Sequence, residues 1–328
     1  MSASQSQVTG TSWTKKSLTI TLSLGKGTFG TTGANTVKLE NLRMIVSVEK
    51  KGFPSLDRAE ARVYGLTPDV MNSVSTLGIP LTMWRPGNAM LIEAGDEGGA
   101  MYTVYNGYLH QAFQDFSEVP ETSMIFVGWG GQAQAITPTN AVSYSGATDA
   151  ATVAKAIADS AGWTFENNGV NVQLSNPYFW GTPLQQAHDL ARAAGIEVYL
   201  DTGNNPLKLA IWPRNATRSG PKPLISTRSG LTRYPKFQSN GMLFQCLFNP
   251  SIRLGGQIVM ESSVGNTTGK IEIGSIGSSA SPQTVQGGPN GDWYVISPLV
   301  YDLSSQLPSG PWFCEVMCAR TNILASQA

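Results

Sequence analysis

The chain has 328 residues, enough for two or three domains of ordinary size, and 41% of them are hydrophobic, which excludes wholesale disorder. Only 13% are charged, about half the usual share of roughly 25%, and lysine plus arginine equal aspartate plus glutamate at 22 each. A neutral chain is a poor candidate for nonspecific binding to nucleic acid or to a membrane surface, and it offers little electrostatic resistance to self-association.

Residues 1–16 are mostly polar, and we predict that they form a flexible N-terminal segment. They lack the apolar core of a signal peptide, and no run of about 18 apolar residues occurs anywhere in the chain. We therefore expect a soluble protein without a recognisable export signal and without a membrane span.

Residues 17–138 carry the pattern of an antiparallel β domain. Polar and apolar side chains alternate in Ser17–Leu24, which indicates a strand with one apolar face. The Gly- and Thr-rich stretch 25–36 then forms a loop or a hairpin tip. Thr67 caps a short helix that Gly78 ends. Further strands are predicted at 41–50 and 58–66 and in the apolar segments up to about residue 137.

Residues 139–213 change in character and predict a compact α+β module with two helices. The first helix is Ala-rich, spans Asp149–Ala161 and is closed by a glycine. The second begins at Thr182, has proline at its first position, and ends at Gly195. Strand-like segments accompany the helices at 163–167, 170–175, 196–201 and 206–212.

Residues 214–328 return to a β pattern after a linker, Arg214–Pro223. A polar Gly- and Ser-rich loop, Gly277–Gly291, interrupts it, and the sequence alone does not decide whether that loop is ordered. Strands are predicted at 241–250, 251–262, 269–276, 292–303 and 311–320. The predicted fold class is therefore mainly β, with two antiparallel β-barrel or sandwich domains flanking a small α+β module that has two helices.

The three cysteines are Cys246, Cys314 and Cys318, an odd number that argues against a disulfide framework. Cys314 and Cys318 have a spacing found in some zinc sites, but no second pair follows. We interpret all three as buried free thiols on strands and predict no metal site. The chain has only two histidines, His110 and His188. We interpret His188, on the second helix of the module, as structural.

Catalytic motifs are missing from the sequence. Neither histidine accompanies a nucleophile elbow, and there is no H-E-x-x-H motif for zinc. Glu93, Asp96 and Glu97 lie close in sequence, yet they have the pattern of a solvated turn rather than of paired catalytic carboxylates. We predict that the protein is not an enzyme and binds no cofactor.

Aromatic side chains are dense at Tyr178, Phe179 and Trp180, immediately before the second helix of the module. Most aromatic residues in a β-rich chain fill the core, and this is the alternative interpretation. Aromatic residues are also enriched at protein interfaces, so the three are candidate subunit contacts.

Three segments resemble the baseplate hub proteins of tailed bacteriophages, the central hubs of contractile tails such as those of T4-like and Mu-like phages. Leu39–Val74 is similar to their opening pair of strands with its short capped helix. Gly230–Ser262 contains a similar glycine before an apolar strand and then C-L-F-N-P. Asp292–Ala319 contains a strand, a polar loop and a tryptophan that leads the last strand. Tyr301 stands where many of these proteins have histidine, which puts that position in doubt.

The resemblance implies a homotrimer whose two tube-like β domains per chain form a pseudo-sixfold ring. Such a hub joins the hexameric tail tube to the trimeric central spike, and baseplate wedge proteins are further candidate partners. It implies a location in the virion tail after assembly in the host bacterial cytoplasm. Phage DNA would pass the central channel without specific binding, and no membrane is involved.

Two alternatives remain at this point. A tail-associated peptidoglycan hydrolase would need a pair of acid and base groups, which the sequence does not display. A tail tube subunit would have the same β texture and differ in its number of copies in each tail.

Overall fold

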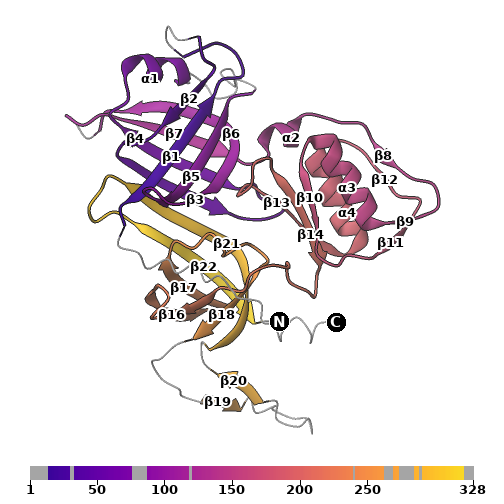
Figure 1. Ribbon diagram of the computed structural model, residues 1–328. Helices are drawn as coiled ribbons and strands as arrows, with labels where there is room; N and C mark the ends of the chain where they lie inside the picture. The colour runs from indigo at the N-terminus through magenta and orange to yellow at the C-terminus, as the bar shows by residue number, and fades with distance from the viewer. Residues whose placement is uncertain are drawn as a thin grey trace.

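The computed structural model describes residues 14–29, 33–75, 87–117, 120–238, 241–261, 269–272, 284–287 and 290–320. Figure 1 shows a β-rich body that runs from the N-terminal strands to the C-terminal strands, with a smaller helix-containing part beside it. None of the helices in these ranges is long and apolar enough to cross a membrane.

The first half of the chain contains β1 (Lys16–Ser23), β2 (Thr36–Leu39), β3 (Met44–Lys50), β4 (Arg58–Tyr64), α1 (Pro68–Val74), β5 (Ala89–Asp96), β6 (Met101–Asp115), β7 (Ser123–Trp129), α2 (Gln132–Ile136), β8 (Val142–Ser143), β9 (Ala147–Asp149) and α3 (Ala150–Ala161). The second half contains β10 (Thr164–Asn167), β11 (Gln173–Ser175), β12 (Tyr178–Phe179), α4 (Pro183–Ala194), β13 (Ile196–Asp201), β14 (Lys208–Pro213), β15 (Leu224–Ser226), β16 (Leu231–Gln238), β17 (Gly241–Leu247), β18 (Gln257–Glu261), β19 (Gly269–Glu272), β20 (Thr284–Gly287), β21 (Gly291–Ser305) and β22 (Trp312–Arg320).

One sheet of 13 strands contains strands from both sides of the module. Its order is β16-β17-β22-β21-β3-β4-β7-β6-β5-β1-β2, and β18 and β15 branch from β21. The connection is antiparallel pairing of β21 with β3, in which Tyr301 lies opposite Val48 and Leu303 opposite Val46. Alternate residues of β3 are buried, so one face of the sheet covers a core shared by early and late strands.

Of the two predicted alternatives, barrel or sandwich domains, the barrel is wrong, because the sheets of this chain are not closed. The strands before and after the module instead join in one sheet through the pairing of β3 with β21. β1 lies against β21 without pairing with it. The division of the chain after residues 138 and 213 stays a prediction. Of the predicted flexible segment 1–16, Lys16 already lies in β1, and residues 1–13 lie outside the described residues.

The α+β part packs α3 and α4 on a small sheet of order β10-β14-β13 (Figure 1). Its apolar core is separate from that of the large sheet and includes Ile157, Leu190 and Ile211. Both helices have the predicted ends. Asp149 accepts a hydrogen bond from the backbone N–H of Ala151, and the glycines that follow both helices are left-handed. The helix α2, of five residues, was not predicted from the sequence.

Several smaller predictions have different outcomes. The Gly-rich stretch 25–36 lies between β1 and β2, which pair antiparallel, so the hairpin prediction is confirmed. α1 begins at Pro68 as predicted and ends at Val74; Gly78 lies outside the described residues. Most of Gly277–Gly291 also lies outside them. All three cysteines are buried and free, on β17 and β22, as predicted.

The β3–β21 connection can be tested through Leu303, which has no exposed surface. Leu303→Ala should lower the free energy of unfolding by about 2–5 kcal/mol, because a cavity remains where the side chain packed. The matched control is Leu224→Ala, at a side chain that is 38% exposed, and it should cost less than about 1 kcal/mol. Urea unfolding followed by tryptophan fluorescence measures both. Equal costs would contradict a buried core at this connection.

Candidate assembly site

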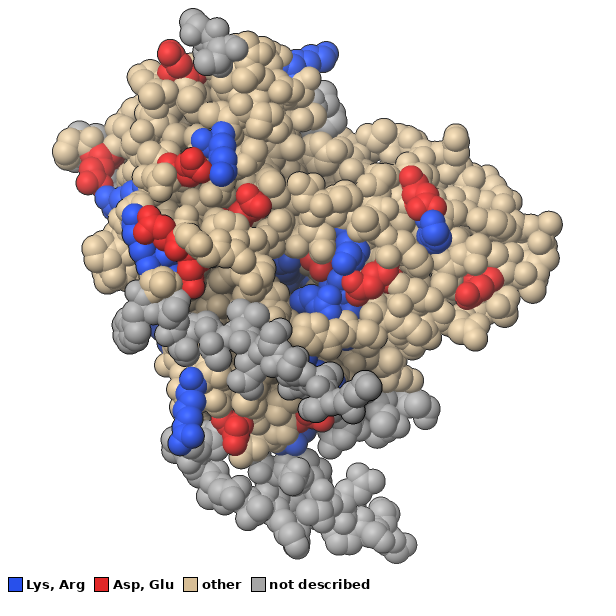
Figure 2. All heavy atoms as spheres, in the orientation of Figure 1, with Lys and Arg blue, Asp and Glu red and all other residues tan. Residues whose placement is uncertain are grey.

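A chain of buried charges lies where the α+β part meets the large sheet. Lys50 ends β3, Asp201 ends β13, and Arg218 follows β14 in the segment predicted as a linker. The Lys50 Nζ lies 3.2 Å from Asp201 Oδ1, and Arg218 Nη1 donates to Asp201 Oδ2 at 2.8 Å. The Arg218 side chain has no exposed surface. Figure 2 shows blue and red side chains close together in the hollow between the β-rich body and the helix-containing part.

Glu166, on β10, completes the partners of Arg218. Arg218 Nε donates to Glu166 Oε1 at 2.6 Å and Nη2 to Oε2 at 3.1 Å, a bidentate pair. Lys208 lies 3.4 Å from the same carboxylate. Burial alone would raise the pKa of Glu166, but the hydrogen bonds and charge of Arg218 outweigh burial and lower the pKa to about 2. In Asp201, Lys50 and Arg218 likewise overcome burial and hold the pKa well below its usual range.

A second buried carboxylate, Asp57, ties the loop between β3 and β4 to the module. It accepts hydrogen bonds from the hydroxyls of Tyr199 and Thr202, each at 2.7 Å, and from the backbone N–H of Lys51 at 3.0 Å. Burial raises the pKa of Asp57, while the charge of Lys50 and these hydrogen bonds oppose the rise. The loop is therefore fixed to β13 by side-chain bonds as well as by packing.

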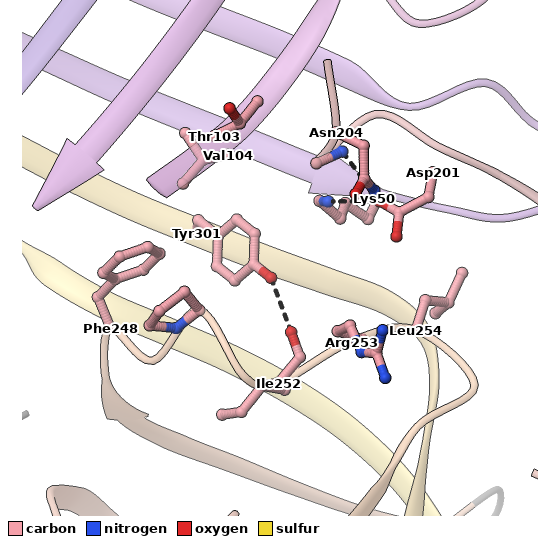
Figure 3. Close-up of a pocket in the computed structure, with 12 residues that line it drawn as sticks. Lys50, Thr103, Val104, Asp201, Asn204, Phe248, Ile252, Arg253, Leu254 and Tyr301 are labelled. Atoms are coloured by element: carbon pink, nitrogen blue, oxygen red, sulfur yellow. Dashed lines mark hydrogen bonds and ion pairs between the residues drawn. The ribbon is translucent and has the colours of Figure 1, made fainter. Parts of the chain in front are cut away.

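A cavity of about 180 Å³ lies beside this cluster (Figure 3). Lys50 and Asp201 lie on one side of it, and Arg253 and Ile252 on the other. Tyr301 lies between them: its ring is 5.7 Å from Lys50 Nζ, and its hydroxyl donates to the Ile252 carbonyl at 3.0 Å. Tyr301 stands where many baseplate hub proteins have histidine. In this chain its side chain is buried and hydrogen-bonded.

This cluster holds chain segments in position. The carboxylates accept hydrogen bonds from fixed donors, and the cations are held between them, so the groups orient three chain segments against one another. Within the described ranges, no group of three or more His, Cys, Asp and Glu side chains suits a metal ion.

The predicted contact residues separate into exposed and buried side chains. Tyr178 is 63% exposed and Trp180 is 62% exposed. Phe179, between them, is 9% exposed and packs in the core of the module, because neighbouring strand residues point to opposite faces. None of the three contributes to the charge cluster. His188 has a half-exposed side chain near the ring of Phe53, with the centroids 6.4 Å apart.

Arg218 and its partners were not predicted from the sequence. Arg218 lies in a run of Pro, Gly, Asn and Ser that resembles an exposed linker, and its carboxylates are 17 and 52 residues away. No local pattern carries that information. The available signal was the lack of any acidic residue between Asp201 and Glu261, which means that a paired cation there must find a distant partner.

Removing the buried guanidinium tests the cluster. Arg218→Met should lower the free energy of unfolding by about 3–5 kcal/mol, because two carboxylates lose their partner. Arg214→Met, in the same segment, removes an arginine that is 65% exposed and 3.4 Å from Glu197, and it should cost less than about 1 kcal/mol. Chemical denaturation at pH 7 measures both. Similar losses in the two variants would show that the cluster contributes no more than a surface ion pair.

The lowered pKa of Glu166 predicts a pH dependence. Its carboxyl binds protons more weakly in the folded protein than in the unfolded chain, where the pKa is near 4.5. Its contribution to stability is therefore complete above about pH 4.5 and is lost as the pH falls toward 2. The difference in unfolding free energy between wild type and Glu166→Gln should shrink over that window. Denaturation at several pH values measures it, and a constant difference would contradict the prediction.

Comparison with known proteins relates this arrangement to phage tails. The family model for baseplate hub gp41 matches residues 17–269. None of the curated protein sequences is significantly similar to this chain.

Two solved structures share the fold. One is the tail protein from Neisseria meningitidis MC58, with a TM-score of 0.55 and 9% identity, covering 95% of this chain and 99% of that one. The other is the 43 kDa tail protein of prophage MuSo2 from Shewanella oneidensis, with a TM-score of 0.53 and 10% identity, covering 93% and 97%. At such identity the likeness shows the fold alone. The family match spans well over half of the sequence, which confirms the predicted resemblance: the chain belongs to the baseplate hub gp41 family.

Proposed function

We propose that three copies of this chain form the hub of a phage baseplate, a ring that joins the hexameric tail tube to the trimeric central spike. The family establishes a structural component of the tail. The observation that carries the finer proposal is the shared sheet, in which strands from both sides of the module pair through β3 and β21. Two β regions in each of three chains give six segments, which matches a sixfold tube above and a threefold spike below.

The other parts of the proposal come from the resemblance to baseplate hubs. Phage DNA would pass through the central opening without specific binding, and assembly would take place in the host cytoplasm before incorporation into the virion. Wedge proteins would contact the outside of the ring. The buried cluster around Arg218 supports this role, because a ring segment has to present its surfaces in one fixed orientation.

Particle symmetry tests the proposed function. Negative-stain electron microscopy of the purified chain, alone and with its candidate spike protein, should give threefold rings with a central opening. Light scattering should give three times the chain mass of 35.0 kDa. Monomers in both preparations would contradict the hub and reopen the search for a hydrolase activity. Long stacked sixfold tubes would identify a tube subunit.

The exposed aromatic pair supplies a second test. Tyr178 and Trp180 are candidate contacts between subunits, since large exposed aromatic side chains often dominate interfaces. The double variant Tyr178→Ser, Trp180→Ser should raise the dissociation constant of the trimer at least about tenfold. Phe116→Ser, at another aromatic side chain that is 58% exposed, is the control and should change it little. Analytical ultracentrifugation measures all three proteins; an unchanged dissociation constant in the double variant would exclude the pair from the subunit contact.

A further inference from the structure

Charge is segregated along this neutral chain. Residues 202–260 contain eight basic residues and no acidic one. The rest of the chain holds the other 14 basic residues and all 22 acidic ones. A net charge of zero therefore combines a strongly basic segment with a net-negative remainder.

Four of the eight cations pair with carboxylates of this chain. Arg218 is bound to Asp201 and Glu166, Lys208 and Arg253 lie within 4.0 Å of Glu166, and Arg214 pairs with Glu197. The other four are exposed, and the described part of the structure gives none of them a carboxylate partner. They are Lys222, Arg228, Arg233 and Lys236.

Two of these four lie on β16, an outer strand of the large sheet. Arg233 is opposite Gln245 and Lys236 is opposite Leu243, so neither faces a charge on β17. Between and beside them, Tyr234 is 53% exposed and Phe237 is 58% exposed. Arginine, tyrosine and phenylalanine are enriched at protein interfaces.

The backbone of β16 decides how a partner could bind. Its pairing with β17 is interrupted by two register shifts, and Pro235 removes a backbone donor. An edge of this kind resists addition of another strand. Contact would therefore be made by the side chains, and its strength would depend on opposite charge in the partner.

We propose that β16, with Lys222 and Arg228 on the segment that precedes it, is the basic half of a head-to-tail contact with the net-negative remainder of a second copy of this chain. The inference rests on the proposed trimeric hub. A ring of identical chains contacts its neighbours through two different surfaces of each chain, and complementary charge on those surfaces favours closure over random association.

Charge reversal on β16 tests the contact. In Arg233→Glu, Lys236→Glu, the dissociation constant of the trimer measured by analytical ultracentrifugation should rise at least about tenfold. The matched control, Lys155→Glu with Arg192→Glu, changes net charge equally on exposed positions of α3 and α4 and should leave it unchanged. In the wild type, raising NaCl from 0.1 to 1 M should weaken the trimer, because the screening length falls from about 10 to about 3 Å. Circular dichroism confirms that each variant is folded.

The outcomes separate this inference from the proposed function. A wild-type trimer whose dissociation constant the β16 reversal does not change overturns the contact and leaves the hub intact. A monomeric wild type overturns both. A labelled 20-nucleotide single strand and its duplex serve as probes in fluorescence anisotropy. If the reversal abolishes their binding while the trimer persists, the surface binds nucleic acid, and the contact between copies is likewise overturned.

Discussion

A fully buried arginine fixes the arrangement on which the rest of this structure depends. Arg218 cannot leave its charge unpaired in the interior, because desolvation of an isolated guanidinium costs far more than folding supplies. Its bidentate bond to Glu166 and its bond to Asp201 can form together only when β10, β13 and the segment after β14 have one placement. Buried ion pairs add little stability compared with apolar packing, so the main effect of this cluster is on orientation.

The orientation matters because the large sheet is continuous. Pairing of β3 with β21 makes early and late strands one wall, and Lys50, at the end of β3, binds Asp201 of the module. The module is thereby fixed to the same strand that joins the two β regions. A shift of the module would change the direction in which its exposed residues, Tyr178 and Trp180, face, and these contacts oppose such a shift.

Local features of the fold could be predicted from sequence, and relations between distant segments could not. Both module helices follow from Asp149, Thr182 and Pro183 at their starts and from glycine at their ends, signals that act within a few residues. The shared sheet depends on pairing between residues about 255 positions apart, such as Ser47 and Asp302, and period-two patterns do not specify a partner strand. Two barrels and one continuous sheet have the same strand patterns. Even a local prediction can fail, as Phe179 shows. It was predicted as a contact residue together with its two neighbours, but its side chain is buried while theirs are exposed.

Net charge is a sum over the whole chain, but the strength of an interface depends on how the charges are distributed over the surface. The neutral total of this chain predicts weak nonspecific binding only if charges of both signs are mixed over the surface. Here a segment of 59 residues has no carboxylate, and the fold divides its cations into two groups. One group pairs with carboxylates: Arg218, Lys208 and Arg253 gather around Glu166, and Arg214 pairs with Glu197 at the surface. The other group, on β16 and on the segment that precedes it, faces solvent. The same excess of positive charge that builds the buried cluster thus leaves a basic edge, and the proposed contact between copies would bring the opposite sign to that edge.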